Sequence, residues 1–205
     1  MALRGKWADG IVPRNFAWVI KDSLAVCERP GGNGENHRRV RRMEEIIWIR
    51  QQEFDHVISL IPATHNLHNY DELEMPYLHR PFGAHEPVRP FLASFYPELR
   101  TMLADGRKLV VHGEEVGDRL CGLVGGYLLW SEMVPLGPQA ISVTERLLTR
   151  KMGPIGRGIV TEAGALAGSV GTCSLAERST PPPGDRPGAC RWRAPARRSA
   201  GRMDR

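Results

Sequence analysis

The chain has 205 residues, which is enough for one domain of roughly 150 residues with extensions. It carries 28 Lys and Arg against 23 Asp and Glu, a formal net charge of +5. Eight arginines and three acidic residues lie within 176–205, so residues 1–175 hold 20 basic and 20 acidic side chains. The excess charge therefore belongs to the end of the chain, and a nucleic-acid-binding surface on the domain itself is not expected.

The four cysteines, Cys27, Cys121, Cys173 and Cys190, show no CxxC pair and no regular spacing. This pattern predicts neither a disulfide framework nor a zinc site, and we expect no metal and no cofactor. The first apolar run, at 16–20, is too short for a signal core, and no window approaches the ~18 apolar residues that span a bilayer. We expect a cytoplasmic protein without a membrane partner.

Residues 1–15 are expected to form an irregular lead-in. Two short strands then surround the Asp22-Ser23 turn, and a helix follows the glycine-rich loop at 29–34. Four arginines lie at the start of this helix. They are Arg38, Arg39, Arg41 and Arg42. The simplest interpretation is a solvated face, and the alternative is a role in contacting an anion.

Apolar runs at 56–61, 77–82 and 108–111 predict buried strands. Helical spacing predicts helices from about residue 90, over 119–131 and over 138–150, although Pro97 opposes the first of these. Residues 161–176 allow a loose helix, and the Pro- and Arg-rich remainder predicts disorder. We therefore expect an α/β fold with a mostly parallel sheet over 16–160 and a disordered tail over 161–205.

The stretch at 108–122 combines a strand, a loop and the start of a helix, a layout that suits anion binding because free amides and the helix dipole meet in the loop. The loop nevertheless carries Glu114, Glu115 and Asp118 against a single Arg119. At an effective dielectric near 20, each acid would repel a bound phosphate by roughly 2–3 kcal/mol. Arg119 can offset about one of them, or close the loop by pairing with Asp118 or Glu115.

The sequence at 110–119 resembles the signature loop of the cysteine-based tyrosine and dual-specificity phosphatases, V-H-C followed by five residues and R. The resemblance extends in order over about 16–160. The strand pair and turn at 18–29, the helix and strand at 48–61, the strand at 77–82 and the helix at 119–130 each resemble their counterparts. The last is most similar to bacterial and kinase-associated dual-specificity members.

In that family the cysteine is a thiolate nucleophile, the arginine holds the phosphoryl oxygens, and an aspartate on the preceding loop protonates the leaving group. The nucleophile position is Gly113 here, and the general-acid position is Ala84, with His85 and Glu86 as possible auxiliaries. No catalytic residue is therefore expected. The expected ligand-binding loop comprises His112, Gly113, Glu114, Glu115, Val116, Gly117, Asp118 and Arg119.

These residues favour a domain that has lost phosphatase activity and binds a protein partner or a phosphorylated or acidic ligand. The alternative is a hydrolase on the same scaffold, either a residual phosphatase or a metal-assisted enzyme using His112, Glu114, Glu115 and Asp118. Cys121 is expected to be a packed helix residue and not a displaced nucleophile. The basic tail would add only weak nucleic-acid association.

Overall fold

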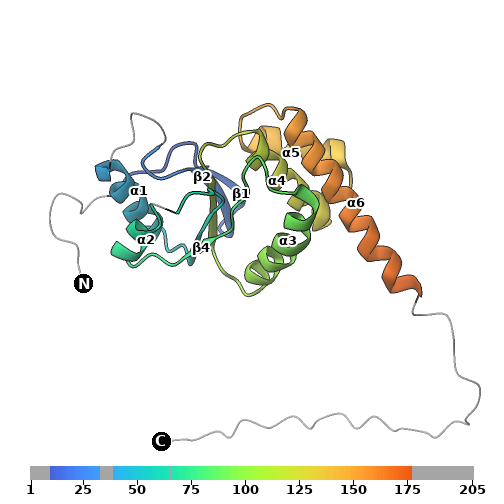
Figure 1. Ribbon diagram of the computed structural model, residues 1–205, viewed down its shortest axis with the longest axis horizontal. Helices are drawn as coiled ribbons and strands as arrows, with labels where there is room; N and C mark the ends of the chain where they lie inside the picture. The colour runs from blue at the N-terminus through green and yellow to red at the C-terminus, as the bar shows by residue number, and fades with distance from the viewer. Residues whose placement is uncertain (1–9, 33–38, 65, 177–205) are drawn as a thin grey trace, which may run out of the picture.

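The computed structural model describes residues 10–32, 39–64 and 66–176 (Figure 1). Its elements in chain order are β1 (Ala17–Ile20), β2 (Leu24–Glu28), α1 (Arg39–Gln51), β3 (His56–Ser59), α2 (His68–Glu72), β4 (Tyr77–His79), α3 (Val88–Ala104), β5 (Leu109–Gly113), α4 (Asp118–Trp130), α5 (Gly137–Leu147) and α6 (Pro154–Ala176). The beginning of the predicted lead-in, 1–9, and most of the predicted tail, 177–205, lie outside the described residues.

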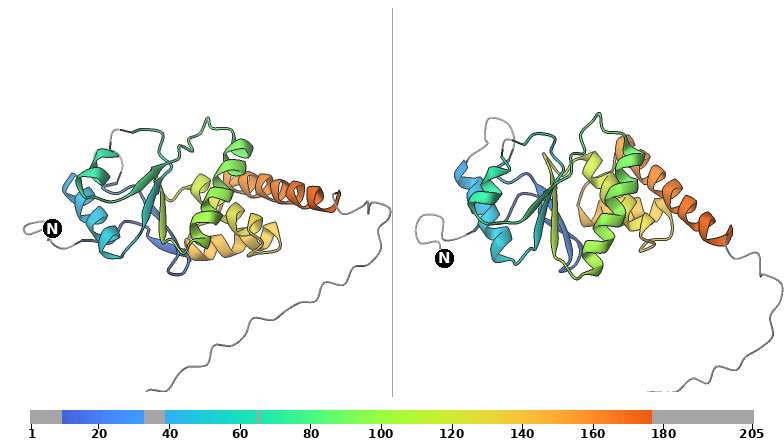
Figure 2. Two further views of the ribbon diagram at one scale, coloured as in Figure 1. Left: turned by 90° about the horizontal axis from the view of Figure 1, so that it is seen from below. Right: turned by 60° about the horizontal axis from the view of Figure 1, so that its bottom comes forward.

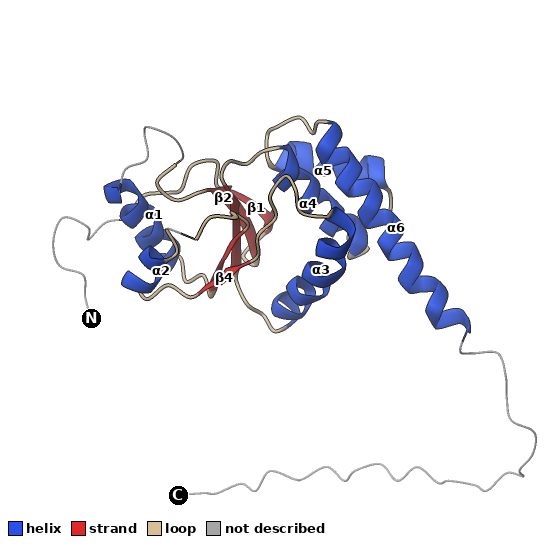
Figure 3. Ribbon diagram, in the orientation of Figure 1, coloured by secondary structure: helices blue, strands red, loops and turns tan. Residues whose placement is uncertain are grey.

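The five strands form one sheet in the order β1-β2-β5-β3-β4. β1 is antiparallel to β2, and every other neighbouring pair is parallel, which confirms the predicted mostly parallel α/β fold. Helices α1 and α2 cover one face, and α3 to α6 cover the other (Figure 3). The strand before the signature-like loop, β5, is therefore central and covered on both faces.

Successive residues of β5 serve two separate cores because strand side chains alternate between faces. Leu109 and Val111 pack in the larger core with α3, α4 and α6. Val110 packs in the smaller core with α1 and α2. All three are at most 3% exposed, which explains why the run reads as continuously apolar and not as alternating.

Helix α3 continues through Pro97, although proline removes the hydrogen bond to the carbonyl of Ala93 and disfavours a helix interior. Phe95, Tyr96 and Leu99 are each no more than 3% exposed on this helix. Burial of these large side chains against the sheet offsets the local cost. Tertiary packing thus decides the helix where propensity opposes it.

The arginines of α1 do not share one environment. Arg39 has 70% of its side chain exposed, as a solvated face requires, and it pairs with Glu72. Arg42 is only 6% exposed and donates to Oδ1 of Asn69 at 3.1 Å, so the predicted solvated face is wrong for this residue. The reason is the short helix α2, which packs over α1 and buries Asn69 and Tyr70.

The predicted domain boundary at residue 160 falls inside α6, which begins at Pro154 and runs to Ala176. Val160 and Ala163 are buried at 2% and 0% exposure. The boundary was placed too early because the glycines make this segment read as a weak helix, whereas its apolar residues pack into the larger core. Figure 2 shows the far end of α6 extending beyond the helices that cover the sheet. Within the described ranges, no helix has the length and apolarity needed to cross a membrane.

Candidate functional site

The loop between β5 and α4 borders a cavity of about 340 Å³, a size within the range of ligand pockets. It lies at the carboxyl ends of the parallel strands, where α/β sheets bind ligands. The loop contributes acidic residues and glycines to the lining of the cavity. Pro62, Phe82 and Ile155 form its apolar walls. The structure therefore places the predicted ligand-binding loop on a real concavity.

Gly113 ends β5 and contributes only backbone to the cavity. Its φ is not in the left-handed region, so the backbone there suits any residue. A Cβ added at Gly113 would lie 3.1 Å from the carbonyl oxygen of Glu115, so even a small side chain requires the loop to move by a few tenths of an ångström. No side chain is present at this position to act as a nucleophile.

Arg119 points to the neighbouring loop between β4 and α3. Its Nε donates to the carbonyl of Phe82 at 3.3 Å, and a terminal nitrogen donates to the carbonyl of Glu86 at 3.0 Å. The guanidinium also lies 4.1 Å from the centre of the Phe82 ring. The alternative of a salt bridge to Asp118 or Glu115 is wrong, because backbone carbonyls and an aromatic ring contact this cation instead.

The three loop acids separate into different contacts. Glu114 accepts from Arg29 at 2.9 Å, and Glu115 lies 4.0 Å from Arg150. Each carboxylate therefore has a cation beside it. The expected repulsion of roughly 2–3 kcal/mol per acid is therefore too large. The sequence did not show that Arg29 and Arg150 lie beside these two acids.

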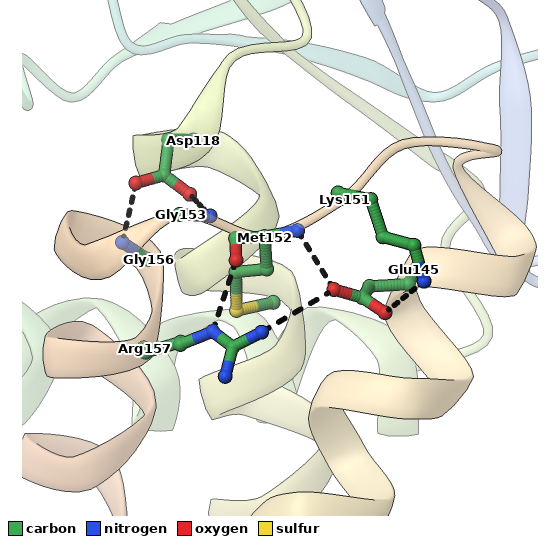
Figure 4. Close-up of polar contacts among 7 residues, drawn as sticks. All are labelled: Asp118, Glu145, Lys151, Met152, Gly153, Gly156 and Arg157. Carbon is green, nitrogen blue, oxygen red and sulfur yellow. Dashed lines mark hydrogen bonds and ion pairs between the residues drawn. The ribbon is translucent and has the colours of Figure 1, made fainter.

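Asp118 is a helix cap and faces α6. Its two oxygens accept the backbone amides of Gly153 at 2.5 Å and Gly156 at 2.9 Å (Figure 4). Gly153 immediately precedes α6 and Gly156 lies in its first turn, where backbone amides have no partner within their own helix. Asp118 thus performs from α4 the role of an N-cap residue, and it is not directed to a ligand.

His112 is buried beneath the loop, with 2% exposure. Its Nε2 lies 2.9 Å from the hydroxyl of Tyr70, and its Nδ1 lies 3.4 Å from the carbonyl of Gly113. Desolvation lowers the pKa of His112 from 6.5 to about 4, so the ring is neutral at pH 7. A buried, neutral ring that contacts the backbone of Gly113 suits a structural role beneath the loop.

The residues on the preceding loop do not supply an acid from within the cavity. Ala84, His85 and Glu86 are exposed, and in the described part of the chain none of them lines the cavity. Glu86 contributes its backbone carbonyl to Arg119. The predicted auxiliary roles of His85 and Glu86 thus have no supporting contact here.

The two cysteines nearest the sheet are also unsuited to nucleophilic attack. Cys27 and Cys121 are at most 1% exposed. Burial raises the pKa of both thiols, so both remain protonated at neutral pH. Cys121 packs in the larger core, as a packed helix residue should.

The residues of the alternative acid and base set are held apart. Glu114 pairs with Arg29, Asp118 caps α6, and His112 contacts Tyr70. Among the residues that the structure describes, no three His, Cys, Asp or Glu side chains are grouped closely enough to hold a metal ion. Neither Arg29 nor Gly153 was identified from sequence, because each contact joins residues tens of positions apart.

Comparison with solved structures identifies the architecture. Kinase-associated phosphatase with its catalytic-site cysteine replaced by serine matches with a TM-score of 0.64 and 17% identity, over 77% of this chain and 98% of that chain. The fold is that of the dual-specificity phosphatases. The active form of Tk-PTP matches with a TM-score of 0.57 and 15% identity, over 74% of this chain and 97% of that chain.

The catalytic core of a PP-IP phosphatase from S. cerevisiae, in complex with citrate, has a TM-score of 0.53 and 14% identity, with 80% of this chain and 96% of that chain covered. No protein-family model and no curated protein matches the sequence. At these identities the likeness establishes the dual-specificity phosphatase fold. It leaves the chemistry to be argued from the site.

Proposed function

We propose that this dual-specificity phosphatase fold is a binding module that does not hydrolyse phosphate esters. The observation that carries the proposal is Gly113 at the end of β5, where the family resemblance places the nucleophile. A covalent phosphoryl intermediate needs a nucleophilic side chain at that point, and glycine has none. The buried, protonated Cys27 and Cys121 offer no substitute.

The position of Arg119 supports the same proposal. A phosphate-binding arginine must present its guanidinium fork to the ligand. Arg119 instead donates to the carbonyls of Phe82 and Glu86. A ligand that recruits Arg119 into the loop would have to replace both hydrogen bonds and the ring contact.

The cavity walls suggest what the module binds. Pro62, Phe82 and Ile155 form an apolar wall of the cavity, and Ile155 itself is 59% exposed. Glu114 and Glu115 are 42% and 60% exposed, so their carboxylates remain reachable beside their arginine partners. We infer a protein partner that inserts an apolar side chain with a basic group next to it, in preference to a phosphorylated or acidic ligand.

The first experiment measures turnover of para-nitrophenyl phosphate and of a phosphotyrosine peptide by the full chain. The wild type should show no turnover above buffer, and Cys121→Ala should be indistinguishable from it. Turnover by the wild type that Arg119→Ala abolishes would overturn the proposal. Turnover that only Cys121→Ala removes would overturn it too, by identifying a displaced nucleophile.

Restoration of the missing groups tests whether the cavity kept its geometry. Gly113→Cys supplies a thiol, and Gly113→Cys/Ala84→Asp adds an acid on the exposed preceding loop. Because general acid catalysis contributes typically 10²–10⁴-fold, the double variant should exceed the single variant by about 10²-fold. Arg119→Ala in that background should remove the gain. An inactive double variant would show that the loop has been remodelled and not merely stripped of its nucleophile.

A further inference from the structure

A surface cavity lies at the turn between α5 and α6, apart from the loop cavity. Its volume is about 520 Å³, which is within the range of ligand sites. The side chains that line it are those of Ser142, Glu145, Arg146, Thr149, Arg150 and Lys151. Three of them are cations and one is a carboxylate, so the lining has a net charge of +2.

The backbone at the end of α5 brings these cations together. Thr149 has a φ of 50°, in the left-handed region where glycine is usual after a helix. The amide of Arg150 then donates back to the carbonyl of Glu145 at 3.1 Å, the pattern of a Schellman cap. Because the chain folds back over the last turn of α5, Arg150 and Lys151 line the same cavity as Arg146.

The one carboxylate of this lining is turned toward the start of α6. Only 15% of the Glu145 side chain is exposed, and it accepts the amide of Met152 at 2.9 Å (Figure 4). Arg157 and Lys151 share this carboxylate at 3.8 Å and 3.2 Å. Lys151 is nevertheless 92% exposed, and its ammonium group has further donors for a second acceptor.

The two arginines of the lining are also accessible to a partner. Arg146 is exposed in the last turn of α5, and its side chain makes no hydrogen bond or ion pair with any residue that the structure describes. Arg150 is 45% exposed, and its contact with Glu115 is 4.0 Å long. Exposed ion pairs of this kind contribute little, so Arg150 can exchange Glu115 for a carboxylate of a partner.

The size of the surface suits an extended segment and not a single small anion. A neighbouring cavity of about 300 Å³ adjoins the first, since Thr149 and Arg150 line both. Val116 and Leu148 contribute apolar lining to this second cavity. A segment that crosses the turn can therefore place acidic side chains over the cations and an aliphatic side chain beside Leu148.

Two other occupants fit this surface less well. Among the described residues that line the two cavities none is aromatic, so the bases of a nucleic acid would find no side chain on which to stack. The end of this chain, 176–205, carries eight arginines against three acids, and like charges repel it from the surface. An acidic segment of another protein has the complementary charge.

We propose that the turn between α5 and α6 binds an acidic segment of a partner protein through Arg146, Arg150 and Lys151, with an aliphatic side chain of the segment beside Leu148. The surface is separate from the loop cavity. The proposal therefore holds whether or not the loop hydrolyses phosphate esters.

Fluorescence anisotropy with the wild-type full chain provides the first test. The probe is a labelled peptide of glutamates around one leucine, and its control has glutamine in place of each glutamate. The acidic probe should bind saturably, and several-fold more weakly when sodium chloride rises from about 0.05 M to about 0.3 M, because salt screens exposed charges. Absence of saturable binding, or equal binding of the two peptides, would overturn the proposal.

A matched pair of double substitutions separates this surface from the other cations of the chain. Arg146→Gln/Lys151→Gln should weaken binding of the acidic probe about tenfold, since each exposed charge contact contributes modestly. Arg39→Gln/Arg89→Gln removes two exposed arginines elsewhere and should leave the affinity unchanged. Both variants lose the same net charge, so equal affinities of the two variants would refute the site.

Cross-linking locates the probe even where the arginines of 176–205 also attract it. A photoreactive group replaces the leucine of the peptide, and mass spectrometry identifies the labelled residues. Cross-links within 142–151 are expected, and cross-links confined to 176–205 would refute the surface. A single-stranded oligonucleotide that displaces the probe more effectively than the unlabelled peptide would assign the cations to nucleic acid, and the proposal would fail.

Discussion

At the scale of single residues, the buried His112 makes the stability of the whole protein depend on pH. It is the penultimate residue of the central strand, contacts the hydroxyl of Tyr70 at 2.9 Å and is 2% exposed. No carboxylate stabilises its protonated form, among the contacts of the described residues. Burial, with smaller contributions from Arg29 and His79, lowers its pKa to about 4. The unfolded chain, in contrast, protonates this ring near 6.5.

This difference predicts a pH dependence of stability. The contribution of His112 is fully present above pH 6.5 and is lost as the pH falls from 6.5 to about 4, because the unfolded state then binds the extra proton. The total loss is roughly 3 kcal/mol at 1.36 kcal/mol per pKa unit. Urea unfolding between pH 8 and pH 4 should show a loss smaller by this amount in His112→Gln than in the wild type.

The exposed His85 supplies a matched control for that measurement. His85→Gln should follow the wild-type curve. Parallel curves for the wild type and His112→Gln would mean that the buried ring is not the group responsible for the lost stability.

At the scale of elements, α6 is anchored by acidic side chains of two other helices. Asp118 of α4 accepts the amides of Gly153 and Gly156, and Glu145 of α5 accepts the amide of Met152 at 2.9 Å (Figure 4). The helices also touch by backbone, since a Cβ on Gly122 would lie 2.5 Å from Cα of Gly156. The acid that the sequence placed in a phosphate loop therefore fixes the start of α6.

Asp118→Asn tests this anchor. The amide nitrogen that replaces one oxygen cannot accept, so one helix amide loses its partner, and the negative charge near two helix N-termini is also removed. The free energy of unfolding should fall by about 1–3 kcal/mol, measured by urea denaturation.

The control is Glu162→Gln, an acid of α6 that lies 4.0 Å from Arg89 with 46% of its side chain exposed. It should change stability by less than about 0.5 kcal/mol. Equal effects of the two substitutions would contradict the capping role of Asp118.

At the scale of the whole molecule, the sheet separates two cores, and α6 completes the larger one. Ala163 is fully buried, and it would lie 3.0 Å from a Cβ added at Gly126 of α4. Leu166 and Ala167 pack against the same core. The domain consequently needs the part of α6 beyond residue 160.

Truncation measures that requirement. A chain of residues 1–176 should unfold at the same temperature as the full chain, because the Pro- and Arg-rich composition of 177–205 predicts no contribution to a core. A chain of residues 1–160 should lose at least about 3 kcal/mol, since it exposes the core beneath α4 and ends a helix in mid-course. Circular dichroism melts compare the three chains. Equal stability of the 1–160 chain would restore the earlier boundary.

Much of the fold was predictable from local pattern. The continuous apolar runs at 56–61 and 108–111 predicted β3 and β5, and the helical spacing over 119–131 predicted α4. The burial of Arg42 was not predictable, because it depends on α2 packing over α1. The same holds for the start of α6, where Gly156 lies against Gly122 and Asp118 of α4.

By itself, the sequence determined the mostly parallel α/β arrangement, the place of the loop after the central strand and the missing side chain at Gly113. Those features follow from residue type and local period. Only the tertiary structure decided what the charged residues do. Arg119 binds the β4–α3 loop, Asp118 caps α6, and Arg29 reaches Glu114, because each partner is brought close by the packing of elements distant in the chain.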